Sequence, residues 1–267
     1  MPETIRTDFH MHSTFSPDGH DTIHQLCRYA LEHELTTIAV TDHVEWQPDG
    51  RQYAPDFPRY FESLLRCREE FGPQGLRILS GLELGNPHHH MPEVQAVLDA
   101  YEFDVVIASL HWLDGENIHN TRIFADRDPY AVYSRYFADL GRMASVAPGN
   151  LIAHFDRIFW PGTQVHGALD TARLEPIVRP ALEQIAARNW VLELNTRFLA
   201  HTPGWNDILQ AVLLWFNEAG GAGVAVDSDA HRCKEIGRHR DVGAVLVRAA
   251  GFPLLNTLPA PQLAVVR

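Results

Sequence analysis

The 267-residue sequence has the composition of a globular protein and a net charge of −12, from 22 Lys and Arg against 34 Asp and Glu. Hydrophobic residues make up 45% of it and charged residues 21%, values typical of a chain that buries a core. The acidic balance disfavours a broad electrostatic grip on nucleic acid, and no apolar run approaches the ~20 residues of a spanning helix. The three cysteines show no Cys-x-x-Cys spacing, which favours a reducing compartment. We therefore expect a cytoplasmic protein.

Strand-like and helix-like segments alternate along the chain without a linker or repeat. Buried-strand runs are predicted in a segment that ends with Phe9 and at residues 37–40, 77–80, 105–108, 150–153, 190–194 and 223–226. Apolar residues at helical spacing predict helices near 22–34, 59–70, 92–100, 130–145, 172–188 and 206–219, followed by an amphipathic tail. This alternation predicts a parallel sheet of seven strand–helix units. We expect a single α/β domain over residues 1–267.

Two histidines, His10 and His12, directly follow the first predicted strand. Successive side chains of an extended backbone alternate between faces, so these two imidazoles point the same way. The Pro-Asp-Gly sequence at 17–19 is typical of a tight turn, which could return the carboxylate of Asp18 toward them. A His-x-His pair alone is equally compatible with a surface or core pair, so its meaning depends on the rest of the chain.

Metal-capable side chains recur at the ends of nearly all the predicted strands. In chain order they are His10, His12, Asp18, His43, Glu83, His111, His154, Asp229 and His231. Strand C-termini gather on one face of a closed parallel barrel, whereas an open sheet collects its site at one switch point, so this distribution favours a barrel. Mixed imidazole and carboxylate ligands suit Zn, Mn or Fe. A lone histidine at a strand end is more often a core residue, but nine such residues predict three divalent ions with a bridging carboxylate.

The sequence from about residue 5 to 235 resembles the PHP (polymerase and histidinol phosphatase) family. The matching motifs are Asp8-Phe9-His10-Met11-His12-Ser13, Ser16-Pro17-Asp18-Gly19, Thr41-Asp42-His43, Gly81-Leu82-Glu83, Ser109-Leu110-His111, Ala153-His154-Phe155-Asp156 and Ser228-Asp229-Ala230-His231. The resemblance implies a distorted (β/α)7, TIM-like barrel with a trinuclear metal centre. The implied ligand sets are His10, His12, Glu83 and Asp229 for one ion, Glu83, His111 and His154 for a second, and Asp18, His43 and His231 for a third. No ligand position is missing, unlike in the metal-free PHP domains of some polymerases.

A site of this composition suits a phosphate ester. Three divalent ions against three carboxylates leave a charge of about +3, which attracts a phosphate dianion. Metal binding lowers the pKa of water from 15.7 toward ~7. We therefore expect a metal-bridging hydroxide to attack phosphorus, with Glu83, Asp229 and His231 at the catalytic centre.

Arginine is expected beside such a site because its planar fork matches phosphate oxygens. Arg157 and Arg197 follow predicted strand ends and are the candidates, with Arg122 as a weaker third. A surface ion pair is an equally good interpretation of each. His43 is predicted to contact the substrate as well as a metal ion.

The family resemblance also implies a substrate class. Stand-alone chains of this length most resemble histidinol-phosphate phosphatases, which hydrolyse L-histidinol phosphate to histidinol and phosphate in histidine biosynthesis. The alternatives are another small phosphoester, such as a nucleotide, a sugar phosphate or phosphotyrosine, and a non-catalytic metal-binding PHP module. Turnover of any phosphoester separates the module from the enzymes. Metal identity, oligomeric state and the group that protonates the leaving alcohol are left open.

Three further features are assigned from local sequence. The run His88-His89-His90 follows Asn-Pro and is predicted to be an exposed loop. Asp42 and Asp156 lie next to or near predicted ligand histidines, and they are predicted to orient those imidazoles.

Overall fold

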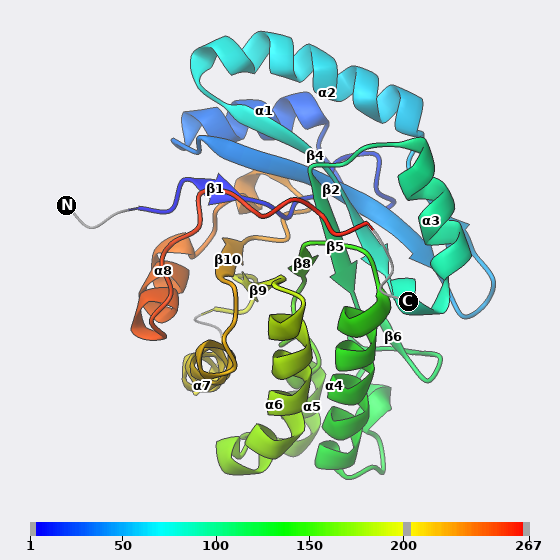
Figure 1. Ribbon diagram of the computed structural model, residues 1–267, viewed down its shortest axis with the longest axis vertical. Coiled ribbons are helices and arrows are strands. Elements are labelled where there is room, and N and C mark those ends of the chain that lie inside the picture. The colour runs from blue at the N-terminus through cyan, green and yellow to red at the C-terminus, as the bar shows by residue number, and fades with distance from the viewer. Residues whose placement is uncertain (1–3, 200–203, 264–267) are drawn as a thin grey trace.

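Seven parallel strands form the centre of the molecule (Figure 1). The computed structural model describes residues 4–199 and 204–263. The strands, in their spatial order, are β1 (Thr7–Asp8), β2 (Thr37–Trp46), β4 (Arg77–Gly85), β5 (Val105–Ser109), β8 (Leu151–Ile152), β9 (Val191–Asn195) and β10 (Val224–Asp227). A bridge between Met11 and Ala230 joins the first strand to the last, and the Ser228 amide donates to Asp8 Oδ1 over 3.0 Å. The sheet is thus nearly closed, and the predicted seven-stranded barrel is confirmed.

Eight helices surround this barrel in the described part of the chain. They are α1 (Ile23–Glu32), α2 (Phe57–Phe71), α3 (Met91–Ala100), α4 (Pro129–Val146), α5 (Phe159–His166), α6 (Thr171–Ala187), α7 (Trp205–Glu218) and α8 (Arg240–Ala249). Short 3-10 helices lie at Gly72–Gln74, Pro87–His89, Thr121–Phe124 and Cys233–Glu235. Figure 1 shows α1 and α2 together beyond one side of the sheet and α4, α5 and α6 together beyond the other. None of the described helices combines the length and apolarity needed to cross a bilayer.

Alternation along each strand separates the helix-facing side chains from those inside the barrel. Interior positions near the strand starts are apolar and form one buried cluster, with Phe9, Ala39, Leu79, Ile107 and Leu151 among its members. Leu255 and Leu258, from the segment after α8, pack against this cluster. Figure 1 shows that segment crossing the strands. Further along the strands the interior positions become polar, so the apolar cluster forms a floor beneath a polar layer.

Two strands run further than the sequence predicts. β2 and β4 were expected to end at Val40 and Ser80, but they continue to Trp46 and Gly85. Their register is unbroken from Thr37 opposite Arg77 to Val44 opposite Leu84. The sequence prediction stopped where the apolar pattern gives way to buried polar residues. The strands continue because the hydrogen bonds between their backbones do not depend on the polarity of the side chains. β2 also continues into an antiparallel pairing with β3 (Gln52–Tyr53).

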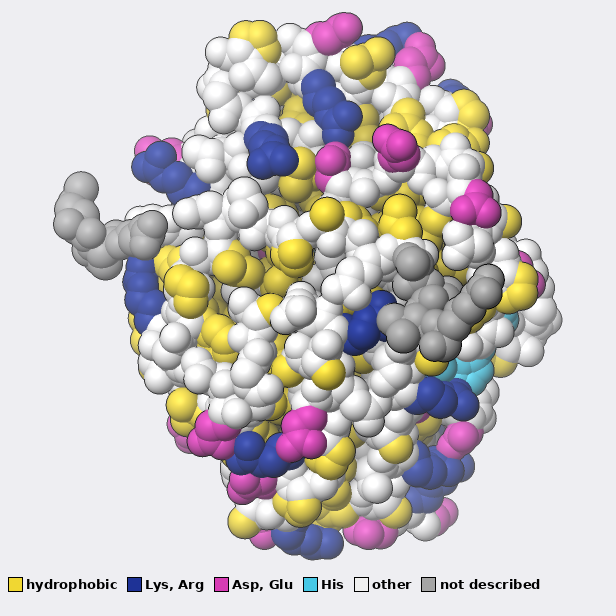
Figure 2. All heavy atoms as spheres, viewed as in Figure 1, with side chains coloured by type: hydrophobic (Ala, Val, Ile, Leu, Met, Phe, Trp, Pro, Cys, Tyr) yellow, Lys and Arg dark blue, Asp and Glu magenta, His cyan; other side chains and the backbone are white. Residues whose placement is uncertain are grey.

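The expected helices are present with shifts of a few residues at their ends, and several small elements were not expected. Two of them are α5 and the hairpin of β6 (Trp112–Leu113) with β7 (Glu116–Asn117). Both are too short for a periodic pattern to be recognised in the sequence. On the face shown in Figure 2, basic and acidic side chains are interspersed between apolar ones.

Candidate metal centre

The side chain of Glu83 lies at the middle of the predicted site. It is 1% exposed, and its Oε2 lies 3.3 Å from His10 Nε2, 3.4 Å from His12 Nε2 and 2.9 Å from His43 Nδ1. Its Oε1 lies 3.1 Å from His111 Nε2 and 3.0 Å from His154 Nε2. One carboxylate therefore faces five imidazoles that come from the ends of four strands, β1, β2, β5 and β8.

His10 and His12 point the same way, as the alternation predicts. Their Nε2 atoms are 3.2 Å apart, and both imidazoles are fully buried. Asp229 lies against this pair, with Oδ1 3.7 Å from His10 Nε2 and 3.3 Å from His12 Nε2. The members of the first implied ligand set thus lie together.

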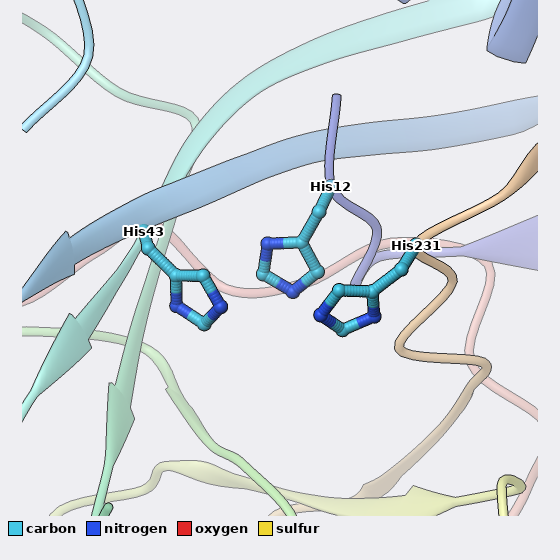
Figure 3. Close-up of side chains that lie close together, drawn as sticks. All are labelled: His12, His43 and His231. Atoms are coloured by element: carbon cyan, nitrogen blue, oxygen red, sulfur yellow. The ribbon is translucent and has the colours of Figure 1, made fainter. Parts of the chain in front are cut away.

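A second group of imidazoles consists of His12, His43 and His231, and Figure 3 shows the three rings side by side. The His12 ring stacks on His43 with centroids 4.3 Å apart and lies 4.4 Å from the His231 ring. Asp18 faces both outer histidines, with Oδ2 3.5 Å from His43 Nε2 and 3.2 Å from His231 Nε2. The turn at 17–19 therefore returns the carboxylate of Asp18 toward the site, although half of that side chain is exposed.

The two predicted substrate arginines take different positions. Arg157 is 3% exposed and pairs with Asp229, so its guanidinium is held by a predicted ligand instead of standing free. Arg197 is 41% exposed, and its NH1 lies 3.8 Å from Asp229 Oδ2. Arg122 is exposed on a short 3-10 helix and does not line the cavity described below.

All nine predicted ligands except the buried pair His10 and His12 line a cavity of about 600 Å³. Arg157 and Arg197 line it too. The remaining wall residues come from loops and hairpins on several sides, namely Pro17, His20, Glu45, Gln47, Tyr53, Trp112, Asn117, His119, Arg232 and Glu235. The predicted site is therefore the floor of one open cavity at the strand C-termini.

Two glutamates that the sequence analysis did not assign to the site bond predicted ligands. Glu193 Oε1 lies 2.6 Å from His10 Nδ1, and Glu45 Oε2 lies 2.6 Å from His111 Nδ1. Gly85 leaves room for Glu45, because a Cβ there would lie 2.0 Å from its Oε2. The sequence does hold a signal for both, since each is a charged residue at an interior position of a buried strand.

The carboxylates and imidazoles of the site shift one another's pKa. Burial opposes the charged form of Glu83, but the positive charges of His10, His43 and His111 outweigh burial and hold its pKa well below the ordinary value. Burial likewise opposes a charged His111, yet the charges of Glu45 and Glu83 raise its pKa to about 9. His12 differs, because burial and the neighbouring imidazoles lower its pKa to about 3. The carboxylates thus draw positive charge into the site while His12 stays neutral, as a metal ligand must be.

These residues fit a cluster of divalent cations. Within the cavity region, three groups of ligand atoms lie within 4.8 Å of one another: His12, His43 and His231; His10, His12 and Glu83; and His43, Glu83 and His111. Glu83 Oε2 and His43 Nδ1 are buried, and neither has a hydrogen bond of good geometry among the described residues. Buried polar atoms without such a bond are costly, and a shared cation would satisfy them. Mixed nitrogen and oxygen donors suit transition metals.

A fourth group, His88, His89 and Asp139, lies outside this cavity. The exposed loop predicted at 88–90 is wrong for His88, whose side chain is 1% exposed and whose Nε2 lies 3.1 Å from Asp139 Oδ1. Arg142 NH2 lies 2.8 Å from that same oxygen and 2.9 Å from His89 Nε2. In this group the guanidinium of Arg142 therefore occupies the place that a metal ion would take. The network ties the loop before α3 to α4.

The two predicted orienting aspartates behave differently. Asp42 accepts hydrogen bonds from the Ser13 amide and hydroxyl and from the Ser16 hydroxyl, each at 2.7 Å, and Ser16 Oγ lies 3.3 Å from His12 Nδ1. Asp42 therefore reaches the predicted ligand His12 through the hydroxyl of Ser16. Asp156 is buried, and neither of its oxygens accepts a hydrogen bond from the described residues, so it orients no histidine in this way.

Comparison with known proteins identifies a family and several relatives. Residues 8–197 match the PHP domain model. The histidinol-phosphatase of Lactococcus lactis subsp. lactis is 27% identical over 260 residues, covering 97% of this chain and 96% of that one. A Clostridium acetobutylicum protein named as a probable histidinol-phosphatase is 25% identical over 86% of this chain and 88% of its own.

Among solved structures, the crystal structure of the Lactococcus lactis histidinol phosphate phosphatase complexed with zinc, L-histidinol and phosphate has a TM-score of 0.85 to this chain. It covers 98% of this chain and 99% of that one at 23% identity, and so shows the fold. The family model covers well over half of the chain, and its range includes seven of the nine predicted ligands. The chain belongs to the PHP domain family.

Proposed function

We propose that this protein is a metal-dependent phosphomonoesterase that hydrolyses L-histidinol phosphate to L-histidinol and phosphate. The observation that carries the proposal is the convergence of four imidazoles and three carboxylates on one cavity whose wall includes Arg197, with the buried pair His10 and His12 against Glu83. The Lactococcus lactis relative, aligned over nearly the whole of both chains, supports the choice of substrate.

Three divalent ions, of Mn, Fe or Zn, would be held by the nine residues. The proposed sets are His10, His12, Glu83 and Asp229; Glu83, His111 and His154; and Asp18, His43 and His231. Ions bound there supply positive charge for the phosphoryl oxygens and lower the pKa of water toward neutrality. The central place of Glu83, with imidazoles against both oxygens, suits a bridging role.

The protein's own residues hold the substrate. Arg197 is partly exposed at the cavity wall and has one short-range acidic neighbour among the described pairs, Asp229 at 3.8 Å, so its guanidinium can turn to phosphate oxygens. Arg157 is fixed against Asp229 and adds positive charge deeper in the cavity. His43 lines the cavity beside Asp18, where it can contact both metal and ester. A cavity of about 600 Å³ is within the usual size for a small-molecule site.

The test is turnover by manganese-loaded protein. We expect kcat/KM for L-histidinol phosphate of ~10⁴ M⁻¹s⁻¹ or more, well above that for p-nitrophenyl phosphate and nucleotides. Chelator-treated protein should be inactive and should recover with added metal. Weak and indiscriminate turnover would keep the metal chemistry and reject histidinol phosphate. No turnover of any phosphoester would support a non-catalytic module instead.

A further inference from the structure

Glu193 is a buried carboxylate in the middle of β9. Its side chain is fully buried, and it lies at an interior position, two residues before the end of the strand. It bonds three groups that belong to three different strand ends: His10 Nδ1 at 2.6 Å, the backbone amide of His154 at 2.5 Å and Asn195 Nδ2 at 3.3 Å. Two of those three residues are predicted ligands.

The contact with His10 fixes the chemical form of its imidazole. A carboxylate oxygen only accepts, so His10 Nδ1 carries the hydrogen and donates it to Glu193. In the neutral ring that a metal ion requires, the lone pair is then on Nε2, which lies 3.3 Å from Glu83 Oε2. A carboxylate behind a ligand histidine both orients the ring and increases its basicity.

The contact with His154 fixes its backbone. His154 has a φ of +27°, a left-handed value that is unfavourable for a residue with a Cβ. Glu193 Oε2 accepts its amide hydrogen and so holds this conformation. In this conformation His154 Nε2 lies 3.0 Å from Glu83 Oε1, whereas His10 faces the other oxygen, Oε2.

We propose that Glu193 is a positioning residue that sets two metal ligands at once, His10 through its ring and His154 through its backbone. The inference rests on the proposed metal centre, in which these two histidines belong to different ions. Glu193 would therefore link two ion sites through these histidines, and it does not itself line the cavity. Glu45 differs from it, because Glu45 bonds one predicted ligand and lines the cavity.

The first test is metal affinity of Glu193→Gln, measured by competition of Zn²⁺ with a chromophoric chelator. His10 and His154 bond different oxygens of Glu193, and glutamine has an oxygen at only one of these positions. Its NH2 group must then face one of the two donors. We expect affinity at two of the sites to fall about 10- to 100-fold, as loss of such outer partners does. The absorption spectrum of the Co²⁺-substituted protein should change as well, because the ligand geometry changes.

Asp104→Asn is the matched control. This carboxylate also accepts a backbone amide hydrogen bond, from Ser80 at 2.9 Å, and pairs with Arg68, but it lies before β5 and does not line the cavity. Its replacement should leave both the Zn²⁺ affinity and the Co²⁺ spectrum unchanged. If Glu193→Gln behaved like this control, the positioning role would be overturned while the proposed function stood. If the wild-type protein bound no metal, both would fall.

A cycle with His10→Ala separates positioning from a general loss of folding. Without His10, Glu193→Gln can act on the metal sites through His154 alone, so its effect on affinity should shrink by several-fold. An undiminished effect in the His10→Ala background, accompanied by equal loss of thermal stability in the metal-free proteins, would show that Glu193 serves the fold alone.

Discussion

His43 and Glu83 are register partners in the adjacent parallel strands β2 and β4, and His43 Nδ1 lies 2.9 Å from Glu83 Oε2. Neighbouring side chains on the interior face of a parallel sheet lie at one level, so the barrel brings ligands together by register. Nearer the strand starts the interior is filled by apolar side chains. This relationship explains how residues 40 positions apart in the chain can serve one site, and it suggests several experiments.

Glu83→Gln should abolish both tight metal binding and phosphatase activity. The carboxylate faces five imidazoles, and a neutral amide can neither balance their charge nor bridge two cations. The loss should exceed the roughly 100-fold that removal of an outer partner costs. Steady-state kinetics and metal analysis of the purified variant measure it. Near-normal rates would remove Glu83 from the centre of the site.

Arg197→Ala should raise KM for a phosphomonoester about 10- to 100-fold, because a charged hydrogen bond contributes about 1.5–3 kcal/mol. Arg122→Ala is the control, since Arg122 is exposed and does not line the cavity. Its kinetics should match those of the wild type. An equal KM in both variants would show that Arg197 does not hold the phosphate group.

Metal-free protein should lose stability as pH rises from about 6.5 to above 9. The folded state raises the pKa of His111 to about 9, so its stabilising charge is fully present below the unfolded value of ~6.5 and is lost as pH passes through 9. The loss attributable to this group is at most about 3 kcal/mol. Urea unfolding in the presence of chelator at pH 6 and pH 9.5 measures the change.

Glu45→Gln identifies the source of that dependence. It removes a carboxylate 2.6 Å from His111 Nδ1, so the free energy of unfolding should vary less with pH than in the wild type. The same protonation predicts that metal binding at pH 7 releases protons, because an imidazolium must deprotonate to become a ligand. Calorimetry in buffers of different ionisation enthalpy counts these protons. Identical pH profiles for the variant and the wild type would assign the dependence to other groups.

His12→Ala and His88→Ala should separate the two histidine clusters. His12 belongs to two of the close ligand groups, so its removal should lower the metal content below three ions per chain. His88 lies in a group where Arg142 already supplies the positive charge, so its removal should leave the metal content unchanged. Elemental analysis of both variants after dialysis gives the answer. Loss of one ion from His88→Ala would instead make that cluster a further metal site.

Several features could be predicted because they follow from local sequence. The apolar periodicity determined the order of strands and helices, and the residues that follow the strands determined the candidate ligands. His10 and His12 are the clearest example, since the alternation of an extended chain alone predicted that their rings share a face, and their Nε2 atoms lie 3.2 Å apart. Boundaries were less accurate where buried polar residues interrupt a strand, as in β2 and β4.

Which side chains contact one another was decided by the tertiary structure. Glu193 and His10 are 183 positions apart in the chain, and the closure of the barrel brings the carboxylate of Glu193 against the imidazole of His10. The pairing of Arg157 with Asp229 and the burial of His88 against Asp139 likewise depend on which strands and helices become neighbours. Sequence periodicity records which face a side chain occupies, because that is a property of one strand or helix. It does not record what lies opposite, because that depends on elements distant in the chain packing against one another.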